Sequence, residues 1–487
     1  MDVILYWNAV ALEAARRDYT LTKDGTGAIF SPEQGGPVKT ARALAMVHIG
    51  MYNAWVGIIP PVPPAIGLLY PTNPVAPQAV PGASAEAAVA AAAAALLVGL
   101  YMRQMAEIGD ELERYKDALK SGGQNATAIS NGQIFGAGVA DAVMRTRAGD
   151  GADAPSPYKP SDAAGKHRAD PYNSAQGYLG STWGNVPPFC IPPIPVLATY
   201  IAPPPGLTSP EYAAAFKEVQ KIGSQTSSLR STAQTAIGLF WAYDGSKNIG
   251  TPPRLYNQCL RAIARSQSNS VTDNARLFAL VNAGLADAGI IAWKAKYDTA
   301  IGNLWRPVLG IREADAGWGP RGTGDGNPNT TGNPFWRPLG GPHSNEPGMP
   351  GGTPNFPSYP SGHATFGTTC FELVRRFYAL KKGKDPDDLT LGDKIRFTLV
   401  SEELNGSTLD ADGSVRTKVE MEMSLNEALK DNLESRIFLG VHWRFDGAKF
   451  GAKNKIVFPT SSGTVEWGGA SIGYILAKQI AAGPLFK

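Results

Sequence analysis

The sequence predicts an all-α protein of two packed helix bundles, with long Pro- and Gly-rich loops and little strand. Apolar residues recur at helical spacing through most of the chain, whereas the alternation typical of strands is scarce. The chain has 487 residues, of which 43% are hydrophobic and 18% charged, so it can bury a large core in more than one structural unit.

The expected helices follow one another with irregular gaps. Helical periodicity covers residues 3–17, 38–57, 83–121, 126–147, 211–222, 231–242, 272–296, 364–380 and 426–439. Pro-rich connections at 60–81 and 151–205 are expected to wrap the surface as ordered loops. A polar stretch at 223–228 suggests a boundary near Gln225, between an N-terminal helical scaffold, residues 1–225, and a C-terminal helical half, residues 226–487, that carries the chemistry.

Charge and hydropathy exclude two classes of partner. The net charge is +3 without a dense Lys/Arg block, so no nucleic-acid partner is expected. The N-terminus lacks a basic region before its apolar part, and the apolar segments 41–59 and 83–101 are too short or too alanine-rich for confident membrane insertion. We therefore expect a soluble protein with no secretory signal and no membrane partner; neither its location nor its oligomeric state follows from the sequence.

The most informative motif is Pro-Ser-Gly-His at 360–363, directly before the helical segment 364–380. The Ser361 hydroxyl, the Gly362 N–H and the His363 imidazole would converge at a helix N-terminus, where anions bind well. The motif ends a Gly-, Pro-, Asn- and Trp-rich stretch, 313–360, which is expected to form the mouth of the site.

A second cluster places Asp446 four positions after His442. At helical spacing the Asp446 carboxylate accepts from Nδ1 and leaves the Nε2 lone pair free, so His442 is predicted as a nucleophile or metal ligand. Three cations, Lys296, Arg306 and Arg436, suit a tetrahedral oxyanion such as phosphate or vanadate. A second histidine, His363, then serves for proton transfer.

Five segments together resemble the vanadium-dependent haloperoxidases, most closely the fungal chloroperoxidase type. They are Trp-Ala-Tyr-Asp-Gly-Ser at 241–246, Ile-Gly-Thr-Pro-Pro-Arg at 249–254, Phe-Pro-Ser-Tyr-Pro-Ser-Gly-His-Ala-Thr-Phe at 356–366, Ser-Glu-Glu-Leu-Asn at 401–405 and the Ser-Arg to Asp stretch at 435–446. The superfamily also contains type 2 phosphatidic acid phosphatases and bacterial acid phosphatases.

The resemblance implies a vanadate cofactor, vanadium(V), bound through Nε2 of His442, in a site that phosphate can also occupy. Its oxygens would contact a set of cations and helix-start groups: Lys296, Arg306, Arg436, Ser361 and Gly362. His363 is the implied acid–base residue that helps hydrogen peroxide bind. Halide, chloride or bromide, would then attack a peroxovanadate and give hypohalous acid, which halogenates small organic acceptors.

Three further positions take their roles from the resemblance. Asp244 is the implied partner of Arg436, although an N-cap role also fits it. Trp293 and Phe356 are halide-site candidates, although both also fit as core aromatics. Algal bromoperoxidases tend to carry His at the position of Phe356, so the apolar ring favours chloride oxidation.

The spacing between the first two cations departs from the family pattern. Nine residues separate Lys296 from Arg306, where the family has six, and on a continuous helix this would turn the two side chains about 60° apart. A bulge over 300–303, around Gly302, is expected to absorb the difference. A second Trp-Arg-Pro at 336–338 repeats the Arg306 motif, but only Arg306 has Lys296 nearby in the sequence.

Two other functions remain open on the residues alone. A soluble acid phosphatase would use His442 as the nucleophile that forms a phosphohistidine and His363 as the acid for the leaving group. An oxyanion-binding module without turnover would result if the insertion had separated the cations.

Overall fold

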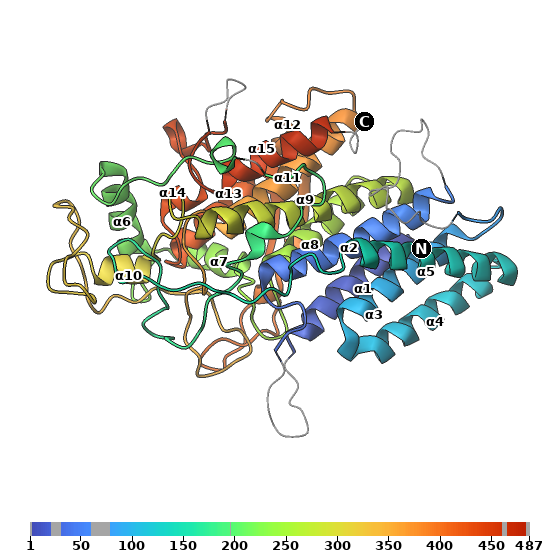
Figure 1. Ribbon diagram of the computed structural model, residues 1–487, viewed down its shortest axis with the longest axis horizontal. Helices are drawn as coiled ribbons and strands as arrows, with labels where there is room; N and C mark the ends of the chain where they lie inside the picture. Colours follow the sequence, from blue (N-terminus) through green and yellow to red (C-terminus); the bar gives the residue numbers. More distant parts are fainter. Residues whose placement is uncertain (1, 21–30, 60–77, 195, 460–464, 484–487) are drawn as a thin grey trace.

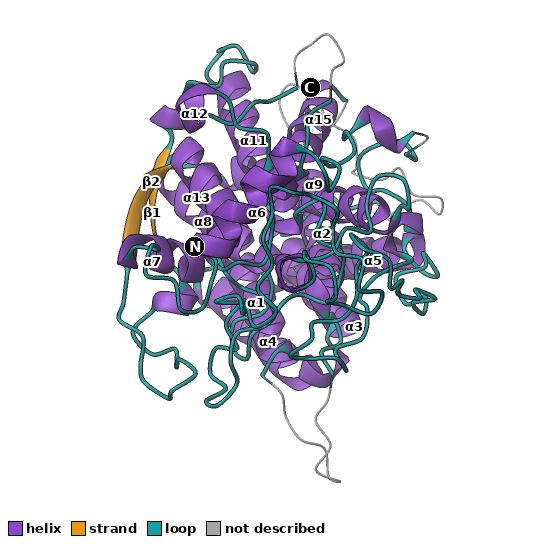
Figure 2. Ribbon diagram, turned by 90° about the vertical axis from the view of Figure 1, so that its left-hand side faces the viewer, coloured by secondary structure: helices purple, strands orange, loops and turns teal. Residues whose placement is uncertain are grey.

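Helices make up nearly all the regular structure in the computed structural model, which describes residues 2–20, 31–59, 78–194, 196–459 and 465–483. Figure 1 shows the N-terminal helices gathered on one side, α11, α13 and α15 on another, and α9 running between them. The sheet found in these residues is one antiparallel pair, β1 (Arg396–Val400) and β2 (Glu420–Ser424), at an edge of the molecule (Figure 2). The predicted all-α class with little strand is confirmed.

The N-terminal helices differ from the prediction at one point. They are α1 (Val3–Asp18), α2 (Gly36–Val56), α3 (Ala85–Leu100), α4 (Met105–Ser121) and α5 (Ala126–Thr146). The single helix expected over 83–121 is wrong, because the chain leaves the helix at Tyr101 (φ −129°, ψ 64°) and continues through the 3₁₀ turn η1 (Met102–Gln104). The alanine-rich α3 is buried along most of its length, whereas α4 buries only Ile108 and Tyr115. The segment expected as one helix is therefore two helices, α3 in the core and α4 at the surface.

The C-terminal helices include several that the sequence analysis missed. In chain order the helices are α6 (Pro210–Ile222), α7 (Thr232–Phe240), α8 (Pro252–Ser266), α9 (Val271–Tyr297), α10 (Pro307–Arg312), α11 (Gly362–Lys381), α12 (Leu391–Lys394), α13 (Leu425–Phe438), α14 (Arg444–Gly447) and α15 (Gly469–Ala482). The missed helices are α8 and α15 and the short α10, α12 and α14. Of these, α8 begins with two prolines. Proline is favourable in the first helical turn, where its missing N–H would have no partner anyway.

Helix α9 is the centre of the core. It packs against α2 on one side and against α11 and α15 on the other, so helices from both predicted halves share one apolar cluster. Of the helices described, α9 is the one long and apolar enough to cross a membrane, but 94% of its apolar window is buried inside the protein. The apolar segments at 41–59 and 83–101 also contribute buried helices, as predicted. The boundary near Gln225 stays a prediction.

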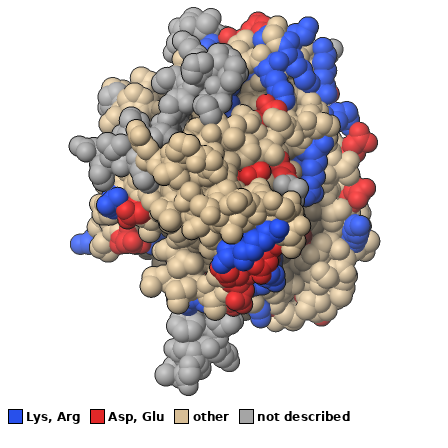
Figure 3. Space-filling model, turned by 90° about the vertical axis from the view of Figure 1, so that its right-hand side faces the viewer, with Lys and Arg blue, Asp and Glu red and all other residues tan. Residues whose placement is uncertain are grey.

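Long loops cover the core. Residues 313–360 contain no helix and only isolated bridges, as predicted. Most of the predicted loop at 60–81 lies outside the described residues, whereas 151–205 forms a loop with the short 3₁₀ turns η2 (Trp183–Asn185) and η3 (Leu197–Thr199). Figure 3 shows positive and negative side chains scattered over one largely uncharged face, in keeping with the small net charge.

Candidate oxyanion site

The N-terminus of α11 forms one wall of the site. Ser361 is the N-cap residue (φ −66°, ψ 124°), and its Oγ accepts from the N–H of Ala364 at 3.3 Å. The N–H groups of Gly362 and His363 lie in the first helical turn and have no partner within the helix. A Cβ on Gly362 would lie 3.2 Å from the Trp293 ring, so glycine suits the close packing here. The predicted helix start is present, and anion binding at it stays a prediction.

His442 lies next to this helix start, with its ring held in a defined orientation. Its Nδ1 donates to Oδ2 of Asp446 at 2.8 Å, and the same oxygen accepts from the N–H of Trp443 at 2.9 Å and from the Ser358 hydroxyl. Burial, followed by the nearby cations Arg306 and Lys296, holds the pKa of His442 well below its usual range. The ring is therefore neutral, with its lone pair on Nε2.

The Asp446 partnership forms without the helix that the spacing suggested. His442 precedes α14, and Asp446 lies within that short helix. The carboxylate reaches back across the first turn, where it also binds the N–H of Trp443 as a capping group. The predicted pair is thus present, but its geometry is that of a helix start.

The two arginines leave buried N–H groups without partners among the described residues. Arg306 donates Nε to the Phe356 carbonyl at 3.0 Å and Nη1 to the Val441 carbonyl at 2.8 Å and to Nε2 of His442 at 3.0 Å, while Nη2 has no partner. Arg436 donates Nη2 to both Asp244 oxygens at 2.8 Å, while its Nε and Nη1 have none. Unpaired buried donors are rare in native proteins. Arg306 contacts the neutral His442 and Arg436 lines the same cavity, so these three donors suit a multiply charged oxyanion.

Lys296 reaches the same region because α9 stops directly after it. The helix ends at Tyr297, Gly302 donates its N–H to the Asp298 carbonyl at 2.8 Å, and Asn303 (φ +60°) donates its N–H to the Lys296 carbonyl at 2.6 Å. The bulge expected over 300–303 is confirmed and begins slightly earlier. The left-handed residue is Asn303, whereas Gly302 is required because its Cβ would meet the Ala295 carbonyl at 1.9 Å.

The Lys296 ammonium group forms hydrogen bonds with the turn before α11. Its Nζ donates to the carbonyls of Pro357 at 2.8 Å and Ser358 at 3.1 Å, and also to that of Pro360. Burial and the neighbouring Arg306 hold the pKa of Lys296 well below its usual range. All three ammonium hydrogens are taken by backbone oxygens, so direct contact with an anion stays a prediction for Lys296.

His363, in the first turn of α11, and Asp244, in the segment after α7, both line the site. The Nε2 of His363 donates to the Ala242 carbonyl at 2.7 Å, which leaves Nδ1 as the nitrogen able to take a proton. Burial and the charge of Arg436 lower the pKa of His363 to about 3. Asp244 pairs with Arg436 and does not cap a helix. The structure therefore brings both predicted residues to the cation cluster.

A cavity of about 560 Å³ opens onto His442, His363 and Arg436. Trp293 and Phe356 form part of its wall, with their ring centres 4.8 Å apart. The Arg306 guanidinium carbon and Lys296 Nζ each lie 5.0 Å from the centre of the Phe356 ring, which therefore lies next to both cations.

Several contributors to the site were missed by the sequence analysis. Ser358 binds Asp446, and Tyr256 and Asn432 each donate to the His363 carbonyl, at 3.0 and 2.9 Å. Ser358 lies inside the 356–366 motif, so a closer reading of that motif would have included it. Tyr19 and Lys39 line the cavity from the N-terminal half, and no spacing rule connects them with residues so distant in the chain.

The fold and the site define a class: a helical protein in which a neutral histidine, an arginine and a helix N-terminus line one cavity, and a second arginine contacts the histidine. Comparisons with known proteins agree. Residues 1–176 match the model of the vanadium chloroperoxidase N-terminal domain, and residues 276–453 match that of the second helical-bundle domain of the same family. The vanadium chloroperoxidase of Curvularia inaequalis is 34% identical, over 95% of this chain and 81% of that protein. The chain belongs to the vanadium chloroperoxidase family, and the predicted class of vanadium-dependent haloperoxidase is confirmed.

Solved structures show the same fold. The first bacterial vanadium-dependent iodoperoxidase superposes with a TM-score of 0.66 at 18% identity, over 98% of this chain and 95% of that one. A holo-type bacterial vanadium-dependent chloroperoxidase gives 0.61 at 14% identity, over 94% of this chain and 95% of that one. Identities this low show the fold alone.

Proposed function

We propose that the protein binds vanadate at His442 and uses hydrogen peroxide to oxidise halide to hypohalous acid. The observation that carries this proposal is a set of three arginine N–H groups without partners among the described residues. One is on Arg306, which contacts the neutral Nε2 of His442, and two are on Arg436, which lines the same cavity as His442. Charge-assisted hydrogen bonds from such donors suit the oxygens of a tetrahedral oxyanion. When bound, vanadium(V) acts as a Lewis acid toward peroxide without changing its oxidation state.

The residues around His442 prepare its Nε2 for metal binding. Asp446 fixes the tautomer and the ring orientation through Nδ1, as carboxylates do behind many histidine ligands. Arg306 would give up its hydrogen bond to Nε2 when that nitrogen binds the metal, and its Nη2 would be free to donate to an oxygen of the oxyanion. Ser361 and Gly362 contribute the helix start, where a negative charge is stabilised.

His363 is the proposed acid–base residue. Its Nδ1 is unprotonated at neutral pH and the ring lines the cavity, so it has a nitrogen that can receive a proton from incoming peroxide. A bound oxyanion would offset the charge of Arg436, one cause of the low pKa, and bring His363 closer to the range of an acid–base residue. The overall reaction oxidises the halide by two electrons, breaks the peroxide O–O bond, consumes one proton and releases water. Hydrogen bonds from His363 to Ala242, and from Tyr256 to the His363 carbonyl, keep the ring in place.

The aromatic wall is the proposed halide region. Trp293 and Phe356 line the cavity next to the cations, which provides an apolar surface backed by positive charge. The cavity volume of about 560 Å³ is within the range of sites for small organic molecules, so an organic acceptor has room beside this wall. We propose small organic acceptors as the final recipients of the halogen.

Substitution of His442 tests the proposal. His442→Ala removes the ligand atom and is expected to abolish both vanadate binding in equilibrium dialysis and peroxide-dependent halogenation. His343→Ala is the matched control, because His343 lines a neighbouring cavity of about 440 Å³ and not this one. Retention of vanadate binding and halogenation by His442→Ala would contradict the assignment. A phosphohistidine-forming phosphatase is not favoured by the comparisons.

A further inference from the structure

The segment after α7 supplies two partners to the site within three residues. The Ala242 carbonyl accepts from His363, and the Asp244 carboxylate accepts from Arg436. Tyr243 lies between them with φ +46°, a left-handed conformation that is unfavourable for a bulky residue. The direction of both groups depends on this one strained residue, so the conformation needs support from elsewhere in the structure.

That support comes from the Ser-Glu-Glu motif at 401–403, which reaches the segment from the loop after β1. The Ser401 hydroxyl donates to the Phe240 carbonyl at 2.7 Å, at the end of α7. The Tyr243 N–H donates to Oε1 of Glu403 at 3.3 Å, and the Tyr243 hydroxyl accepts from the Glu402 N–H at 2.9 Å. Contacts therefore lie on both sides of Ala242.

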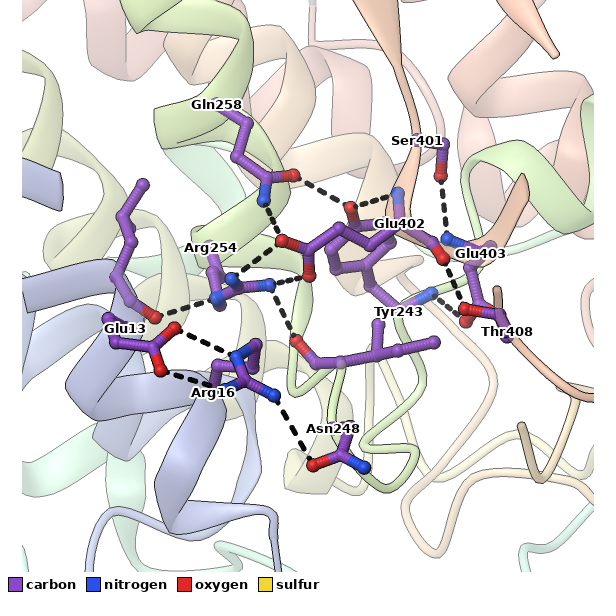
Figure 4. Close-up of polar contacts among 12 residues, drawn as sticks. Glu13, Arg16, Tyr243, Asn248, Arg254, Gln258, Ser401, Glu402, Glu403 and Thr408 are labelled. Atoms are coloured by element: carbon purple, nitrogen blue, oxygen red, sulfur yellow. Dashed lines mark hydrogen bonds and ion pairs between the residues drawn. The ribbon is translucent and has the colours of Figure 1, made fainter. Parts of the chain in front are cut away.

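Figure 4 shows this network around the 3₁₀ turn η4 (Glu402–Leu404). The Tyr243 hydroxyl donates to Gln258 at 2.7 Å, and Gln258 donates to Glu402 at 2.9 Å. Arg254 pairs with Glu402 and donates its Nε to the Leu12 carbonyl of α1 at 2.7 Å. The motif is thus anchored to α8 and α1, and through them to the core.

Glu403 is the buried centre of the network, with no exposed surface. Its Oε2 accepts from Arg416 at 2.7 Å and from the Ser344 hydroxyl, which leaves Oε1 for the Tyr243 N–H. Arg416 is held in turn by Asp410 at 3.2 Å. The carboxylate is therefore fixed before it meets Tyr243.

We propose that Glu403 is a positioning residue for the oxyanion site. It holds Tyr243 in its left-handed conformation, and thereby directs the Ala242 carbonyl at His363 and the Asp244 carboxylate at Arg436. This role rests on the proposed function, because it concerns how tightly that site holds vanadate. Glu403 makes no hydrogen bond to His363 or Arg436. It acts through the backbone at Tyr243, which lies between Ala242 and Asp244.

Two double variants separate the positioning role from a purely structural one. Removing Glu403 alone would leave Arg416 charged, buried and without its closest partner, which is strongly destabilising. Glu403→Met with Arg416→Met removes both charges and the acceptor for Tyr243. Glu403→Gln with Arg416→Met also removes both charges but keeps an amide oxygen at the acceptor position. The two double variants therefore differ mainly in whether an acceptor for the Tyr243 N–H is present.

The readouts are the vanadate dissociation constant from equilibrium dialysis and the melting temperature. The methionine pair is expected to bind vanadate about 10- to 100-fold more weakly than the parent, in the range found when supporting partners of metal ligands are lost. The glutamine pair is expected to stay within about threefold of the parent, since an acceptor remains. Equal vanadate affinity in two folded double variants would overturn the proposal.

Two further outcomes are informative. If a double variant does not fold, Ser401→Ala provides the test. The Ser401 hydroxyl donates to the Phe240 carbonyl at 2.7 Å and accepts from the Glu403 N–H at 3.3 Å, so its loss loosens the link between Glu403 and the segment after α7. A several-fold weaker vanadate affinity is expected for Ser401→Ala, and an unchanged affinity would overturn the proposal. If the parent protein itself binds no vanadate, the proposed function is wrong. If the parent binds vanadate but the folded variants bind it equally well, only the role of Glu403 is wrong.

Discussion

Gly302→Ala should misalign the cation cluster by blocking the turn that joins Lys296 to Arg306. The new Cβ would lie 1.9 Å from the Ala295 carbonyl and 2.6 Å from the Lys296 carbonyl, against an ordinary contact of 3.4 Å or more. The turn must therefore shift by about 1.5 Å. Overpacking of this kind costs about 1–3 kcal/mol. A displacement of about 1 Å at a catalytic centre can cost about 100-fold in rate.

The assay combines vanadate binding, thermal unfolding and the kcat/KM of peroxide-dependent halogenation. We expect Gly302→Ala to lose about 100-fold in kcat/KM and to bind vanadate more weakly, because Arg306 moves with the turn. Gly109→Ala is the matched control, since its Cβ meets nothing within 4 Å in α4 and should add up to about 1 kcal/mol of stability. Wild-type binding and rate in a folded Gly302→Ala protein would refute the reasoning.

Three other predictions concern single side chains. Asp446→Asn removes the anion that fixes Nδ1 of His442 and should weaken vanadate binding about 10- to 100-fold; an affinity within threefold of the parent would contradict this. Phe356→His should lower chloride oxidation more than bromide oxidation, and equal losses would argue against a role in halide choice. His48→Gln should flatten the pH dependence of stability between pH 4 and 6.5, because burial lowers the pKa of His48 to about 4. In that window only the unfolded chain binds the proton, so the free energy of unfolding of the parent should fall by up to about 3 kcal/mol as the pH falls. If the melting temperatures of the two proteins depended on pH in the same way, the assignment would be refuted.

The hydrogen bonds of buried His48 suit its neutral form. Its Nδ1 donates to the Leu44 carbonyl at 2.6 Å and its Nε2 accepts from the Asn8 amide at 2.8 Å. The neutral tautomer satisfies both contacts, whereas a second proton would face the Asn8 donor. His48 thus has a structural role, and its contact with Asn8 could not be found from spacing because Asn8 lies on another helix.

Local patterns were enough to predict α9, α11 and α13, three of the helices that carry the chemistry. The periodicity of α9 and α11 is strong, and Ser361 begins α11 as the Pro-Ser-Gly-His motif indicates. Weaker patterns gave errors. The interruption at Tyr101 was missed because both flanking segments are helical, and α8 was missed because Pro252 and Pro253 suggest a loop when they start a helix.

The sequence predicted which residues belong to the site better than it predicted the contacts that these residues make. Spacing paired His442 with Asp446, and the bulge after Lys296 was expected from the inserted residues. The three backbone carbonyls that surround the Lys296 ammonium group could not be predicted, because they depend on how the 357–360 turn folds against α9. The role of Glu403 likewise follows from long-range contacts to Tyr243, which no local pattern records.

The most direct test of vanadate-dependent halide oxidation uses metal-free protein before and after addition of orthovanadate. Halogenation of monochlorodimedone is measured with hydrogen peroxide and either chloride or bromide, and phosphate-ester hydrolysis is assayed in parallel. We predict halogenation only after vanadate is added, with competition from inorganic phosphate for the same site. Halogenation that does not depend on vanadate, or phosphate-ester hydrolysis inhibited by vanadate without any halogenation, would contradict the account.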